Sequence, residues 1–431
     1  MTLPLFAYIA ILLLAALLST RVIKLLKLPN VTAYIITGII MGPFVFGLLF
    51  NNFTYEGIKE APLYGYISQI SWVSTVALGF IAFSIGTSFK TTILKSVGKR
   101  VLVITILEAF GGSLLVVGAL AVAHLLFPEQ VSLTVVLTLG AIASATAPAA
   151  TLMVIKQYRA KGPVVNTLLP VVALDDAAAL ILFAILFQIA TAISGEGSFD
   201  IYKMIAKPLI EIVISIAFGA VLGIIISLLN KLFHSRNNKL VLCIFAVFAS
   251  LGLWMLFKYE NLGGFELSSL LMCMMAGAIY TNMSEDSGRT LDVYDRFTSP
   301  IYMMFFVISG ASLDLSIFFN STGLVVLAIA GVYIVFRVAG KYLGALVGAS
   351  LTHAEPTVKK YLGLTLVPQA GVAIGLATTA GKLFSENPAT AEAGALIVAI
   401  ILSSTLIYEL IGPLVSKFAL KKAGEISEEE N

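Results

Sequence analysis

Charged residues are scarce in this sequence. Asp, Glu, Lys and Arg make up 12% of the 431 residues, about half the roughly 25% typical of soluble proteins. Hydrophobic residues make up 59%, which excludes a water-soluble domain. The two cysteines, Cys243 and Cys273, lie inside apolar runs and argue against a disulfide framework. Three widely separated histidines, His124, His234 and His353, give no support to a structural metal site, and a net charge of +3 is too small for a nucleic-acid surface.

Long apolar runs recur along the whole chain. A bilayer core is crossed by about 20 apolar residues in a helix, and each of these runs is long enough to do so. They predict an all-α integral membrane protein of about thirteen transmembrane helices. The predicted helices cover residues 5–27, 31–50, 67–88, 100–126, 131–156, 163–193, 206–233, 239–257, 263–281, 297–316, 322–350, 359–382 and 390–419.

Most basic residues fall in loops that follow odd-numbered segments. These loops hold Arg21, Lys24, Lys27, Lys90, Lys95, Lys99, Arg100, Lys156, Arg159, Lys161, Lys231, Arg236, Lys239, Arg289, Arg296, Lys359, Lys360, Lys417, Lys421 and Lys422. The loops between them hold only Lys59, Lys203, Lys207, Lys258 and Lys382. Because cytoplasmic loops are rich in Lys and Arg, we expect an outside N-terminus and a cytoplasmic C-terminus. We also expect a location in the plasma (inner) membrane.

A pair of adjacent acids lies in the middle of the sixth segment. Asp175 and Asp176 occur in LLPVVALDDAAALILFAIL, where two ionised and unpaired carboxylates are unfavourable. Such a pair is expected to exchange protons for cations. Successive helical residues diverge by about 100°, so one acid can face a buried partner while the other faces a cavity. The candidate partners are Arg337 and Lys341, in VYIVFRVAGKYLGALVGAS.

Other acids also lie inside apolar segments, among them Glu108 and Glu409. Glu108 is near a segment start, which favours snorkelling or packing against a polar neighbour, although it is also a candidate accessory acid. Glu409 is deeper and equally consistent with a structural partner for a cation and with an accessory acid. Gly340, Gly344 and Gly348 recur at every fourth position and predict close helix packing.

Helix-breaking residues interrupt two segments at mid-depth. They are Ser144, Thr146 and Pro148 in the fifth segment, and Pro368, Gln369 and Gly371 in the twelfth. Each segment is the fifth of a six-helix run, and interrupted helices at matching positions indicate an inverted-repeat transporter with its site at the midplane. We expect one repeat over residues 1–195, a linker helix over 196–238, a second repeat over 239–420 and a cytoplasmic tail over 421–431.

Several motifs together resemble the monovalent cation:proton antiporter superfamily, the sodium/proton exchangers of the double-aspartate type. They are LPNVTAYIITGIIMGP (28–43), SATAPAA (144–150), LDDAAAL (174–180), FFVISGASLDL (305–315), RVAGKYLGA (337–345), LVPQAGVAIGL (366–376) and STLIYELIGP (404–413). The resemblance implies two crossing broken helices, a mobile core at about 100–193 and 322–419, and a dimerisation domain at about 1–50 and 239–316. It also implies a homodimer and no cofactor.

The same resemblance implies roles for individual residues. Asp176 would bind the ion, Asp175 would pair with Arg337, and Lys341 is a second candidate charge partner. The Thr146 hydroxyl and backbone carbonyls would coordinate Na⁺ or Li⁺ beside Asp176, because Ala147 stands where many members have an aspartate. The remaining implied residues are Ser144 at the cation site and Pro148, Pro368, Gln369 and Gly371 at the crossing.

The implied activity is exchange of protons for sodium or lithium by alternating access, with potassium as the alternative cation. A buried lysine can lose its proton but an arginine cannot, so an Arg337 partner favours electroneutral exchange and Lys341 would allow a second proton. An intramembrane aspartyl protease is disfavoured, because adjacent acids on one helix cannot converge on one carbonyl. A passive cation channel is the other alternative, which turnover rate and saturation would distinguish.

Overall fold

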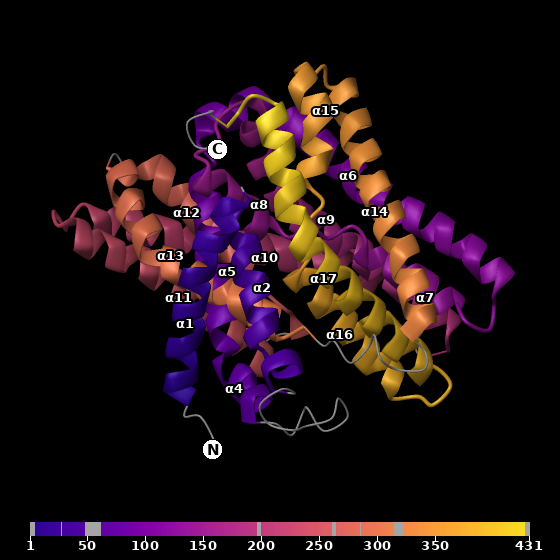
Figure 1. Cartoon of the computed structure of the whole chain (residues 1–431). Helices are drawn as coiled ribbons and strands as arrows, with labels where there is room; N and C mark the ends of the chain where they lie inside the picture. Colours follow the sequence, from indigo (N-terminus) through magenta and orange to yellow (C-terminus); the bar gives the residue numbers. More distant parts are fainter. Residues whose placement is uncertain are drawn as a thin grey trace. The chain divides into compact units, whose positions relative to one another are not determined.

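The computed structural model describes residues 5–26, 28–47, 62–195, 200–260, 264–284, 286–313 and 323–426, which form helices and connecting turns without β-strands. Lys27, Lys59 and residues 427–431 of the predicted tail lie outside this part. The α-helices, labelled in Figure 1, are α1 (Leu5–Leu25), α2 (Asn30–Met41), α4 (Pro62–Ile70), α5 (Trp72–Thr87), α6 (Thr91–Leu126), α7 (Leu133–Ile142), α8 (Pro148–Gln157), α9 (Pro163–Ile193), α10 (Lys207–Asn230), α11 (Arg236–Tyr259), α12 (Ser269–Met283), α13 (Ser287–Ala311), α14 (Gly323–Leu351), α15 (Pro356–Thr365), α16 (Gly371–Ser385) and α17 (Ala391–Lys422). Two short π-helical turns, η1 (Pro43–Gly47) and η3 (Tyr202–Ala206), complete the described helices.

Nine stretches of the described chain are long and apolar enough to cross a membrane. The other four predicted spans correspond to α12, to α13 and to the pairs α7/α8 and α15/α16, so the number thirteen stays a prediction. Large apolar side chains such as Leu114, Val213 and Leu324 are 64–83% exposed. A surface of this kind suits lipid and not water, and the protein is a multi-pass membrane protein.

The two predicted helix interruptions are present in the structure. The fifth predicted span divides into α7 and α8 around residues 143–147, and α8 restarts with Pro148 at its first position. The twelfth divides into α15 and α16 around residues 366–370. Proline lacks the N–H that a continuous helix needs, which explains why a proline lies within the second interruption and directly after the first. The all-α fold with two broken helices is therefore confirmed.

The chain forms two compact units. Unit 1 comprises residues 1–22, 33–98 and 209–312, and unit 2 comprises residues 23–32, 99–208 and 313–431. The assignment of a mobile core and a dimerisation domain to particular ranges stays a prediction.

Unit 1 has an interior of aromatic and small residues. Helix α5 packs against α12, where Gly86 lies against the backbone of Met274 and Gly277 against that of Phe83. The Tyr294 hydroxyl donates a hydrogen bond to the Phe80 carbonyl at 2.8 Å. Small residues at such positions let helix backbones approach closely, which is how helices commonly pack in membranes.

Unit 2 contains both broken pairs together with α9, α14 and α17. Its apolar core includes Val136, Leu139, Tyr333, Ile400 and Tyr408, which come from α7, α14 and α17. Helix α17 packs against α16, which runs beside it in Figure 1, and also against α7, α8 and α15. One long helix therefore contacts all four halves of the broken helices.

Candidate functional site

The ammonium group of Lys341 is the centre of a buried polar cluster in unit 2. Its Nζ donates hydrogen bonds to Glu108 Oε2 at 2.6 Å, to Thr146 Oγ1 at 2.7 Å and to the Asp175 carboxylate at 3.3–3.4 Å. The three charged side chains are at most 1% exposed. An ammonium has three N–H donors, and each finds an acceptor on a different element: α6, the first break, and α9.

A seam of glycines brings Glu108 close to Lys341. Gly340 and Gly344 of α14 lie against the backbone of α6, at Gly111 and at residues 107–108 respectively. A Cβ atom at any of these glycines would overlap the opposite backbone. The predicted close packing of this glycine stripe is therefore present, and it places an acid of α6 within ion-pair distance of a cation of α14.

Arg337 has a different set of partners. Its Nε donates to the Ala143 carbonyl at 3.1 Å, its Nη2 to the Ala145 carbonyl at 2.6 Å and its Nη1 to the Val367 carbonyl at 2.8 Å. The guanidinium also lies 4.7 Å from the centre of the Tyr408 ring. The last carbonyls of a helix have no intrahelical donors and carry partial negative charge. Arg337 thus supplies donors to carbonyls at the end of α7 and within both interruptions.

Gln369 and a backbone bond also join the two breaks. The Gln369 amide nitrogen donates to the carbonyls of Ile142 at 3.0 Å and Ala145 at 3.3 Å, and its oxygen accepts from the Tyr333 hydroxyl at 3.0 Å. The Ala147 N–H donates to the Pro368 carbonyl at 2.9 Å. These bonds satisfy polar backbone groups that the interruptions leave without helical partners.

Asp176 has surroundings unlike those of Asp175. It is 5% exposed, and its Oδ1 is buried without a hydrogen-bond partner in the described part of the chain. Asp175, one residue earlier on α9, is held by Lys341. A buried carboxylate oxygen without a donor is costly, and binding of a proton or a cation would remove that cost.

The partner of Asp175 differs from the one that the resemblance implies. The contact comes from Lys341, whereas Arg337 donates to backbone carbonyls. The physical reason is their position along α14. Arg337 lies beside the backbone carbonyls that the two interruptions leave without helical partners. Lys341, one helical turn further on, lies beside Asp175. Glu108 is not a snorkelling side chain, because it is fully buried and forms an ion pair.

The remaining predicted residues occupy positions around this cluster. Ser144 donates to the Ala141 carbonyl at 2.8 Å, and Pro148 and Gly371 are the first residues of α8 and α16. Glu409 is buried on α17, next to Tyr408. Tyr333 and Tyr408 were not singled out from the sequence. The spacing of four between Tyr333, Arg337 and Lys341 could have placed Tyr333 on the face of α14 that carries both cations.

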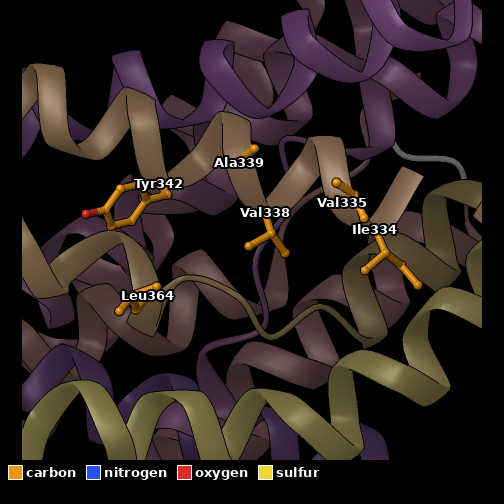
Figure 2. A pocket seen from close by; sticks show the side chains of 6 residues that line it. All are labelled: Ile334, Val335, Val338, Ala339, Tyr342 and Leu364. Carbon is orange, nitrogen blue, oxygen red and sulfur yellow. The ribbon is translucent and has the colours of Figure 1, made fainter. Parts of the chain in front are cut away.

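An apolar groove of about 430 Å³ lies between α14 and α15 (Figure 2). Its lining is Ile334, Val335, Val338, Ala339, Tyr342 and Leu364. None of these side chains has a carboxylate, so the groove lacks the hard oxygen ligands that alkali cations need. In the described part of the chain, no three residues among His, Cys, Asp and Glu gather in a way that could hold a metal ion.

The sequence model of a family described as "Sodium/hydrogen exchanger, transmembrane" matches residues 9–417. The chain belongs to this family. It is a family of transmembrane exchangers and not of enzymes. No curated protein matches the chain.

Two solved structures of the sodium proton antiporter MjNhaP1 from Methanocaldococcus jannaschii have a similar fold. One, determined at pH 8, has 19% identity and a TM-score of 0.66, and covers 98% of this chain and 99% of its own. The other, from an electron-microscopy map, has 19% identity and a TM-score of 0.74, with coverage of 99% and 100%. At this identity the likeness shows that the exchanger fold is shared over the full length.

Proposed function

We propose that this protein exchanges protons for a monovalent cation, and that Asp176 is the group for which the two compete. The observation that carries this proposal is the contrast within the acid pair. Lys341 holds Asp175, while Asp176 has a buried oxygen without a partner. A carboxylate in this condition binds either a proton or a small cation, and the two exclude each other.

Oxygen ligands for the cation are available close to this pair. The Thr146 hydroxyl is anchored by Lys341, and Asp175 adds a second carboxylate on the same helix. A cluster of hydroxyl and carboxylate oxygens is suited to hard alkali cations. We therefore propose sodium or lithium as the transported cation, with potassium as the alternative.

Alternating access would expose this site to each side of the membrane in turn. The crossing is held by Arg337, by Gln369 and by the bond between Ala147 and Pro368. We propose that the two breaks move together, because these bonds link them. The basic loops would lie in the cytoplasm, the N-terminus outside, and the protein in the plasma membrane as a homodimer.

The contact between Lys341 and Asp175 affects the expected stoichiometry. The argument for electroneutral exchange required Arg337 as the partner of Asp175, and that contact comes from Lys341 instead. A buried lysine can release its proton, whereas an arginine keeps it. Exchange of two protons per cation is therefore chemically available, and a test with an imposed membrane potential decides between the two stoichiometries.

The direct test is proton flux in proteoliposomes on addition of sodium, lithium or potassium. We expect sodium or lithium to drive proton movement, and Asp176→Asn to abolish it, because an amide can neither bind a proton reversibly nor balance a cation. Asp292→Asn is the matched control, because Asp292 is exposed on α13. Absence of proton movement in wild type with all three cations, or normal exchange by Asp176→Asn, would overturn the proposal. Cation flux without proton movement would indicate a channel.

A further inference from the structure

The first turn of α9 is capped by a residue from far along the chain. Pro163, at the first position, has no N–H, and no local side chain caps this helix. The next two N–H groups, of Val164 and Val165, donate to the two carboxylate oxygens of Glu425 at 2.6 and 2.9 Å. The Asn166 N–H donates to the Gly162 carbonyl at 2.9 Å. All donors of this turn are therefore satisfied, two of them by Glu425.

The end of α17 directs Glu425 to this position. Gly424 has a φ of 76°, in the left-handed region that favours glycine. The Gly424 N–H donates to the Lys421 carbonyl and the Glu425 N–H to the Leu420 carbonyl, which together form a Schellman motif. The Glu425 carbonyl then accepts the Lys161 N–H at 3.0 Å. Both backbone and side chain of Glu425 thus bind the segment that begins α9.

Two more features show that this contact is closely fitted. A Cβ atom on Gly162 would overlap the Glu425 carboxyl group, so only glycine leaves room for the acid. The Lys417 ammonium lies 4.4 Å from the centre of the Tyr158 ring, a second contact between the end of α17 and the loop before α9. Glu425 and Ile426 are 6% and 5% exposed, although they follow an exposed Lys422.

This contact lies at the start of the helix that carries the acid pair. Asp175 and Asp176 lie about 20 Å along α9 from the cap, at 1.5 Å of rise per residue. Pro170 lies between them and the cap, and it removes one helical hydrogen bond there. The stability of the first two turns of α9 therefore depends on Glu425 more than it would in a helix without Pro170. Because α17 also packs against all four halves of the broken helices, Glu425 links α9 to the element that positions the crossing.

We infer that Glu425 is a positioning residue for ion exchange, which keeps α9 in register with the broken helices, and that Gly162 is needed for its approach. The inference rests on the proposed function, because it gives Glu425 an effect on the cation affinity of Asp176. Glu425 itself does not contact the transported ion.

The test compares Glu425→Ala and Glu425→Gln with Glu386→Gln, which removes a charge from an exposed position of the same unit. Sodium-driven proton flux gives the apparent KM and Vmax of each variant. For Glu425→Ala we expect a rise in apparent KM of about fivefold or more with Vmax within about twofold, because loss of the cap would shift α9 and with it the cation site at Asp176. Glu425→Gln should recover part of the affinity, because its amide oxygen can still accept one N–H.

Hydrogen exchange of the amides of Val164 and Val165 gives a readout that does not require transport. We expect faster exchange in Glu425→Ala than in wild type and in Glu386→Gln. Wild-type KM and unchanged amide exchange in Glu425→Ala would overturn the inference, and so would a loss of Vmax alone, which indicates a purely structural role. If wild type moves no protons, the proposed function fails, while amide exchange still tests the cap.

Discussion

The two units of this protein bury different chemistry. In the described part of unit 1, the buried charged residue is Lys239, which pairs at 3.3 Å with an Asp286 side chain that is 58% exposed. The interior of unit 2 contains Glu108, Asp175, Asp176, Arg337, Lys341, Glu409 and Glu425. Unit 2 is also the unit with broken helices, whose backbone carbonyls need donors. Charge is thus buried in the unit whose backbone is interrupted, whereas the helices of unit 1 pack through aromatic rings and glycines.

Removal of a buried cationic side chain should have the largest effect on stability. The size of this effect should also differ most between the two units. Lys341→Met leaves Glu108 and Asp175 without their ammonium, and breaking a buried ion pair costs about 3–5 kcal/mol. Lys239→Met should cost within about 1 kcal/mol, because its partner is largely exposed. Thermal midpoints of the detergent-solubilised variants would measure both.

A second substitution sharpens this prediction. Adding Glu108→Gln to Lys341→Met removes one of the two uncompensated acids, so part of the lost stability should return. Equal midpoints for Lys341→Met and Lys239→Met would show that the two interiors do not differ in this way.

In unit 1, a side chain that adds volume should be more damaging than the removal of a charge. A Cβ atom on Gly86 would overlap the Met274 carbonyl oxygen, so Gly86→Ala should cost about 1–3 kcal/mol through overpacking. Gly118 of α6 has open space around its Cβ position. Gly118→Ala should therefore be neutral or stabilising by up to about 1 kcal/mol. Thermal midpoints again give the answer, and a Gly86→Ala variant as stable as Gly118→Ala would contradict the close packing of α5 and α12.

The smallest predicted effect concerns the pH dependence of stability. Burial raises the pKa of the Glu425 carboxyl above 4.5, although the N–H groups of Val164 and Val165 oppose this shift. Between its unfolded and folded pKa values the folded protein holds more of this proton, so the free energy of unfolding falls as pH rises. Glu425→Gln should lack this component, which begins near the ordinary glutamate pKa of 4.5 and extends above it, and Glu386→Gln should keep it. Identical slopes of midpoint against pH for wild type and Glu425→Gln would contradict the prediction.

Much of the architecture could be predicted from local sequence signals. The range 163–193 is the observed extent of α9, because a long apolar run between polar loops limits a membrane helix at both ends. The interruptions at Pro148 and Pro368 were also predicted from a local signal, because a proline lacks the backbone N–H that a continuous helix needs at that position. Asp175 and Asp176 stood out because charge is rare within a span.

Contacts between distant segments could not be predicted in the same way. Whether Arg337 or Lys341 contacts Asp175 depends on the rotation of α14 about its axis. It also depends on where the unpaired carbonyls of the interruptions lie along that helix. The sequence around either residue contains neither piece of information. The link between Glu425 and α9 spans residues more than 250 positions apart. At the start of α9, Gly162 offers no side chain as a cap, and that absence was the one local sign that a distant group caps it.

The glycine seam between α6 and α14 constrains how this protein can change over evolution. Where Gly111, Gly340 and Gly344 meet, two backbones touch without side chains between them, so rotamer changes cannot widen the gap. Mutation can alter the charge of Glu108 or Lys341 in a single step. A change in their separation would require a shift of two whole helices, so the spacing of the pair should be inherited more faithfully than the identity of its members.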